Sequence, residues 1–175
     1  MFLSCGGYDF FDDHELNRFL IATWQDTKMG DKYVITENYI SYHGFNSLFM
    51  DPDIEYAGTI EYISNFSDNA GVIIIKYDDY KPTYYTNAHW TDEDHWMDLW
   101  TEGEICHEHQ LPLKGNYIGI YYRELRPGVS AKIGGAYVYG GAEQTTLNAA
   151  KKAFTLGNEG TYMGEYGTYS FKSSP

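Results

Sequence analysis

Short stretches of alternating apolar and polar residues, separated by turn signals, run through the chain from Trp24 to about Tyr85. Met29-Gly30-Asp31 and Glu37-Asn38 have the composition of turns between three such stretches. Val72-Ile73-Ile74-Ile75 is a β-branched run that is typical of a buried central strand. Strands joined by turns this short pair with their neighbours in sequence. The first half of the chain therefore predicts an antiparallel meander.

The same rhythm continues in the second half of the chain. GNYIGIYYREL and VSAKIGGAYVYG read as two strands joined by a turn at Arg126-Pro127-Gly128, and YMGEYGTYSFK reads as a closing strand or two. YKPTYYTNA adds a further strand after Pro82. We therefore predict a mainly β fold, an up-and-down antiparallel β-barrel of about eight strands, which leaves room for side chains and one small ligand. An open sandwich is the alternative, because periodicity does not separate the two.

Two segments have helical rather than alternating spacing. Near the N-terminus, three apolar residues at helical spacing predict a short helix that begins at Asp12 or Asp13; they are Leu16, Phe19 and Leu20. Late in the chain, residues 142–160 predict an amphipathic helix, with Gly157 just past its end. Its apolar face is formed by Leu147, Ala150 and Phe154.

The charge of the chain limits its partners. The 175 residues include 25 acidic and only 12 basic residues, which gives a net charge of −13. Such a surface repels phosphate backbones and anionic lipids, so we expect no binding to nucleic acid. A neutral, cationic or metal partner suits it better. The longest apolar run, Val72–Ile75, is far too short to span a bilayer.

The first residues contain FLSCGG, which resembles the end of a bacterial lipoprotein signal, where a cysteine becomes lipidated. The positive region and the longer apolar run of a signal peptide do not precede it. We expect residues 1–12 to be a lipobox remnant and tether, and residues 13–175 to be a single barrel domain held by Cys5 in a bacterial cell envelope. An incidental cysteine is the alternative, in which case Cys5 and Cys106 could form a disulfide.

Residues 87–114 interrupt the strand pattern with an acidic insertion rich in Trp and His. Four histidines offer metal ligands: His107, His109, His95 and His89. If residues 107–109 are extended, the two outer histidines point the same way about 7 Å apart and could share a zinc ion. Their spacing matches no strong zinc signature, so incidental histidines in an exposed loop are the alternative. We expect no other cofactor.

No arrangement of residues indicates a catalytic site. Cys106 and His107 are neighbours, and neighbouring side chains diverge in an extended segment, so they do not form a nucleophile and its base. The aromatic residues instead suggest binding. The ligand-binding candidates are Tyr56, Tyr62, Trp90, Trp96 and Tyr121. Trp96 and Trp100 also have the spacing of one face of a short helix, which would make them packing residues.

The order of elements resembles the lipocalin-like superfamily. In that family a short helix leads into Gly-X-Trp at the start of the first strand, and a late helix precedes a closing strand. The counterpart here is Ala22-Thr23-Trp24, which departs from the pattern at Ala22. The family's tryptophan is covered by an arginine from a late strand, and the resemblance implies this role for Arg123.

Four segments look more specifically like uncharacterised exported lipoproteins of spirochaetes: GDKYVIT, EYAGTIEYISNFSDNAGVIIIKY, YIGIYYREL and AKKAFTLGNEG. The resemblance implies a lipid-anchored barrel and no known activity. We expect a non-enzymatic protein that binds a small hydrophobic or aromatic molecule inside the barrel. Two alternatives stay open: a surface module that contacts a protein partner through residues 87–114, and a metal-binding protein that uses the histidines.

Overall fold

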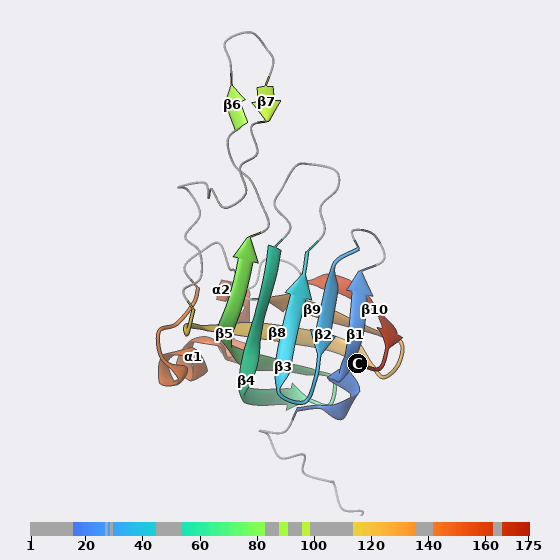
Figure 1. The fold of residues 1–175 in the computed structure, drawn as a ribbon. Coiled ribbons are helices and arrows are strands. Elements are labelled where there is room, and N and C mark those ends of the chain that lie inside the picture. Colours follow the sequence, from blue (N-terminus) through green and yellow to red (C-terminus); the bar gives the residue numbers. More distant parts are fainter. Residues whose placement is uncertain are drawn as a thin grey trace, which may run out of the picture.

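Eight strands close into one antiparallel barrel in the computed structural model of the chain (Figure 1). Each strand pairs with its neighbour along the barrel, and pairing between the last and the first closes it. The predicted mainly β, up-and-down barrel is confirmed, in place of an open sandwich. In barrel order the strands are β1 (Ala22–Asp26), β2 (Lys32–Ile35), β3 (Tyr39–His43), β4 (Ile54–Ser67), β5 (Ala70–Pro82), β8 (Tyr117–Arg126), β9 (Ser130–Gly135) and β10 (Gly167–Ser173).

The structure describes part of the chain: residues 16–26, 28, 30–44, 54–82, 88–90, 96–98, 114–135, 142–162 and 166–175. Between β5 and β8, two short strands form a two-stranded sheet of their own, β6 (Ala88–Trp90) and β7 (Trp96–Asp98). The helical spacing read for Trp96 is wrong, because this residue is paired in β7. β5 itself extends to Pro82 by pairing with β4, and the strand predicted after Pro82 falls on residues 83–87, which lie outside the described part of the chain.

The helical elements are short. They are η1 (Arg18–Leu20), α1 (Leu147–Ala153), η2 (Leu156–Asn158) and α2 (Glu159–Tyr162). Of the predicted N-terminal helix, the structure describes residues 16–20, and these contain one 3₁₀ turn, which the Asn17 side chain caps by accepting the Phe19 amide; its predicted start at Asp12 or Asp13 lies outside the described residues. Late in the chain the structure has two α-helices instead of one. No helix among the described residues is long and apolar enough to cross a membrane.

The helix α1 covers the outer face of the barrel at β8. A Cβ atom at Gly119 would lie 2.7 Å from Cγ of Phe154, so the missing side chain allows the helix to approach the strand. Phe154 ends α1 in a non-helical conformation and is almost fully buried, which is why the helix stops before the predicted Gly157. Because of this cover, residues Val72–Ile75 are buried on both faces of β5, as their β-branched sequence predicts.

Trp24 lies in the core beside the closing seam between β1 and β10. Its side chain is fully buried, and its Nε1 donates a hydrogen bond of 2.9 Å to the Leu20 carbonyl. The ring of Phe171 on β10 meets it edge to face, with centroids 5.9 Å apart. Arg123, the residue expected to cover Trp24, instead forms an ion pair with Glu159.

Candidate functional site

Five tyrosines from five strands gather inside the barrel at one end, where β3 and β5 finish and β2 and β4 begin (the upper end in Figure 1). We call them the tyrosine cluster: Tyr33, Tyr42, Tyr56, Tyr77 and Tyr169. The strand register brings them together, because Tyr42 of β3 lies directly opposite both Tyr33 of β2 and Tyr56 of β4. Residues opposite each other in a sheet share a face, so these rings point into the barrel side by side.

The rings of the tyrosine cluster contact one another. Tyr42 stacks on Tyr56, with centroids 4.9 Å apart and an angle of 28° between the ring planes. Tyr33 lies 4.7 Å from Tyr42 and meets Tyr169 edge to face at 5.1 Å. Tyr77 meets Tyr56 edge to face at 6.1 Å. These separations are those of attractive aromatic pairs, so this end of the interior is lined by a continuous aromatic surface.

The phenol groups give this aromatic surface a polar centre. The hydroxyls of Tyr33 and Tyr56 form a hydrogen bond of 3.0 Å. A Cβ at Gly135 would lie 2.7 Å from the Tyr56 hydroxyl, so that glycine of β9 makes room for it. Burial raises the pKa of both tyrosines well above the ordinary value. Both phenols therefore stay neutral at physiological pH and keep their hydrogen for donation.

Tyr42 and two carboxylates mark the rim of the tyrosine cluster. Tyr42 is half-buried, and its hydroxyl donates a hydrogen bond of 3.0 Å to Oδ2 of Asp31. Asp31 lies in the turn between β1 and β2, where its carbonyl accepts the Asp26 amide at 2.8 Å. Asp26 is directly opposite Tyr169 across the β1–β10 pair. The rim therefore places acidic groups beside the aromatic rings.

The predicted ligand-binding tyrosines fall on two sides of the barrel wall. Tyr56 belongs to the tyrosine cluster, whereas Tyr62 and Tyr121 lie on the outer face beside the helices. The ammonium group of Lys151 lies 4.1 Å from the Tyr62 ring centroid, and the Tyr121 hydroxyl donates to the Thr155 carbonyl at 3.2 Å. An irregular register between Ile60 and Tyr62 reverses the face on which Tyr62 lies.

Four members of the tyrosine cluster were not among the predicted site residues: Tyr33, Tyr42, Tyr77 and Tyr169. The sequence signal for such residues is alternation within a strand. Each tyrosine lies two positions from another residue on the same face: Tyr33 from Ile35, Tyr42 from Ile40 and Tyr56 from Gly58. Trp90 and Trp96 lie opposite each other in the β6–β7 sheet, and the directions of their side chains are outside the described structure.

The predicted metal and lipid sites fall mostly outside the described residues. His95, His107, His109 and Cys5 lie outside them, and only the strand position of His89 in β6 is described. Within the described ranges, no three His, Cys, Asp or Glu side chains are grouped so that they could hold a metal ion. Zinc binding and lipidation therefore stay predictions.

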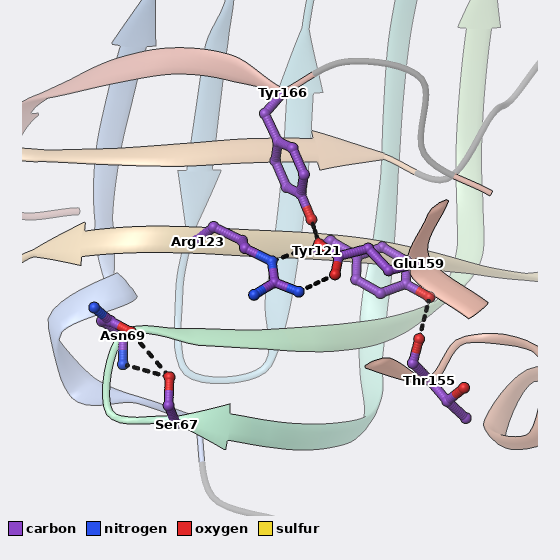
Figure 2. A network of polar contacts seen from close by, with 7 residues as sticks. All are labelled: Ser67, Asn69, Tyr121, Arg123, Thr155, Glu159 and Tyr166. Atoms are coloured by element: carbon purple, nitrogen blue, oxygen red, sulfur yellow. Dashed lines mark hydrogen bonds and ion pairs between the residues drawn. The ribbon is translucent and has the colours of Figure 1, made fainter. Parts of the chain in front are cut away.

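An ionic network fastens the late helical segment to the outer face of the barrel (Figure 2). Nε of Arg123 on β8 donates to Oε1 of Glu159 on α2 at 2.6 Å, and Nη2 donates to Oε2. The Tyr166 hydroxyl, next to the start of β10, also donates to Oε1 of Glu159. The hydrogen bonds from Arg123 and Tyr166 lower the pKa of Glu159, although partial burial opposes them. The network connects β8, α2 and β10, and we assign it a structural role.

This network predicts a loss of stability in acid. Because the folded state lowers the pKa of Glu159, the contribution of this residue to stability is complete above the ordinary glutamate pKa of 4.5 and disappears as the pH falls through the lowered pKa of the folded state. Arg123 is 35% exposed, so we expect the contribution to be less than about 1 kcal/mol at neutral pH. Urea unfolding between pH 7 and pH 3 measures it. A Glu159→Gln variant should show a smaller decrease than the wild type, and an equal decrease would contradict the assignment.

No protein-family model matches the sequence, and comparisons with curated proteins and with solved structures give no significant match.

Proposed function

We propose that this protein binds a small apolar or aromatic molecule at the tyrosine cluster and does not transform it. The observation that supports the proposal most directly is the convergence of five tyrosine rings from five strands at one end of the closed barrel. Barrels of eight strands can hold one small ligand among their interior side chains. Binding sites for such ligands combine apolar and aromatic walls with a few polar groups, and the tyrosine cluster supplies both.

Tyr42 offers a route into the site. It is half-buried at the rim, whereas the Tyr56 ring on which it stacks is almost fully buried. A side-chain rotation of Tyr42 would uncover the Tyr56 face, and a flat aromatic ligand would then take over the stacking contact that Tyr42 makes. Tyr56 would thereby exchange one aromatic stacking partner for another, which keeps the free-energy cost of opening the site small.

Titration of the purified protein with a neutral fluorescent naphthylamine tests the proposal. We expect one molecule to bind per chain, and Tyr42→Ala to lower the dissociation constant by about tenfold, because the ligand then no longer competes with one stacking contact for the Tyr56 face. Tyr39→Ala is the matched control, since Tyr39 is half-buried on the same strand and lies three positions away, on the opposite face. Absence of binding to the wild type, or equal effects of the two substitutions, would contradict the proposal.

We further propose that the chain is a lipocalin-like lipoprotein held in a bacterial envelope through Cys5. The support for this proposal is the sequence FLSCGG and the barrel architecture that the resemblance implies. The genomic sequence before the Met1 codon tests it. About 12 to 20 in-frame upstream codons should encode Lys or Arg followed by apolar residues, and an upstream stop codon within that interval would refute the anchor.

The β6–β7 sheet supports a second candidate function, a contact with a protein partner. These two strands pair only with each other and take no part in the barrel sheet. Trp90 and Trp96 are paired residues of this sheet, which forms no ladder with the barrel strands. Failure of every small-molecule probe to bind the tyrosine cluster would favour this function over the first.

A further inference from the structure

We infer that the ligand of the tyrosine cluster carries a positive charge, as an organic ammonium group that lies against the rings beside Asp31 and Asp26. This inference rests on the proposed function and specifies the class of ligand. It follows from the position of these two carboxylates relative to the rings.

At the rim, two carboxylate residues lie beside the aromatic surface. Asp31 accepts the hydroxyl hydrogen of Tyr42, so its carboxylate is held at the edge of the tyrosine cluster. Asp26 shares the inner side of β1 with Trp24, two positions earlier, and lies opposite the inward Tyr169. The two aspartates are linked through the backbone hydrogen bond between the Asp26 amide and the Asp31 carbonyl. The β1–β2 turn therefore brings both residues close together at this end of the barrel.

The basic residues of the same strands face the other way. Lys32 directly precedes the inward Tyr33, so it lies on the outer face of β2. His43 of β3 is opposite Lys32 and shares that outer face. Lys28 is exposed in the β1–β2 turn, where its amide donates to Asp26 at 2.6 Å. Among the described residues of β1, β2, β3 and the β1–β2 turn, the charged residues placed on the inner side are thus acidic.

Tyrosine rings attract cations through the negative charge of their faces. A cation over such a face gains about 0.5–1 kcal/mol when exposed and about 2 kcal/mol or more when desolvated. When Tyr42 rotates away to admit the ligand, the Asp31 carboxylate gives up the hydrogen bond from Tyr42 and can face the cation instead. Burial raises the pKa of Tyr169 most, Tyr33 and Tyr42 raise it further, and the negative charges of Asp31 and Asp26 add to the increase, as expected for carboxylates near the buried ring.

The long-range field of the molecule favours the same ligand class. The chain carries a net charge of −13, so cations are concentrated near its surface and anions are depleted. A ligand with a quaternary or protonated amine and an apolar body would use the acidic rim for its charge and the rings for its body. A purely apolar ligand would use the rings alone.

Isothermal titration at low salt with three probes of similar shape tests the inference. The probes are phenyltrimethylammonium, its neutral isostere tert-butylbenzene, and benzenesulfonate. We expect phenyltrimethylammonium to bind at least about tenfold more tightly than tert-butylbenzene, and benzenesulfonate to bind most weakly. In Asp31→Asn, which keeps an oxygen acceptor for Tyr42, the advantage of the cation should decrease about tenfold while tert-butylbenzene binds as before.

Asp68→Asn is the matched control, because it removes the same charge from an exposed turn between β4 and β5, where the Asp68 carbonyl accepts a hydrogen bond from Asn17. If Asp68→Asn and Asp31→Asn reduced the affinity advantage of phenyltrimethylammonium equally, the effect would be due to net charge and the inference would be overturned. Equal binding of the cation and tert-butylbenzene to the wild type would also overturn it while the proposed function stands. If none of the three probes binds, the inference and the proposed function both fail.

Discussion

Replacement of Trp24 by alanine is expected to lower the free energy of unfolding by about 4 kcal/mol. The side chain is fully buried, so its removal leaves a large cavity in the core. It also removes the hydrogen bond to the Leu20 carbonyl and the edge-to-face contact with Phe171 across the closing strand pair. Because small domains are stable by only about 5–15 kcal/mol, this variant should lose a large fraction of its stability.

Urea unfolding followed by circular dichroism measures this effect without dependence on the lost indole fluorescence. Trp24→Phe is the control, since it keeps an aromatic ring in the cavity and removes the donor to Leu20. We expect Trp24→Phe to cost about 1.5 kcal/mol. A loss below about 1 kcal/mol in Trp24→Ala would show that β1 and β10 do not depend on this side chain.

The second large effect is expected from Gly58→Ala in β4, at about 3 kcal/mol of lost stability. A Cβ atom at Gly58 would lie 2.3 Å from the Lys76 carbonyl oxygen and 2.9 Å from its carbon. Both are backbone atoms of the paired strand β5, so no side-chain rotation relieves the clash. The strand register is irregular between Ala57 and Gly58, and we attribute the close approach of the two backbones to this irregularity.

Gly160→Ala is the control for the loss of a glycine. A Cβ at Gly160 meets nothing within 4 Å, and the residue lies in α2, where alanine is favoured over glycine by up to about 1 kcal/mol. Thermal unfolding should therefore show a clear decrease in Tm for Gly58→Ala and no decrease for Gly160→Ala. Equal Tm values for the two variants would show that β4 and β5 can separate at Gly58 without cost.

The barrel could be predicted because its strands follow local rules. The turns at Glu37-Asn38 and at Arg126-Pro127-Gly128 separate strands in the structure as the sequence indicates. The β-branched run Val72–Ile75 occupies the buried centre of β5. Turn composition and β-branching are properties of neighbouring residues, so they can be read without knowledge of the partners.

The tyrosine cluster was harder to predict because it depends on register between strands. Strict alternation places Tyr62 on the same face as Tyr56, but the irregular pairing near Ile60 moves Tyr62 to the outer face. Tyr169 reaches the cluster only because β10 closes onto β1. A single residue of slip reverses a side chain, and local sequence does not show where a slip occurs. Similarly, α1 ends before Gly157 because its C-cap residue Phe154 packs against Gly119, which is distant in sequence.

Closure of the barrel by β1 and β10 has a consequence for synthesis. The two strands stand at opposite ends of the described chain, yet each needs the other for its hydrogen bonds. The emerging polypeptide therefore cannot complete its sheet on the ribosome until the codons for β10 have been read. Contacts this remote in sequence form slowly, so a newly made copy passes through a period in which the edges of β1 and β9 that pair with β10 are open.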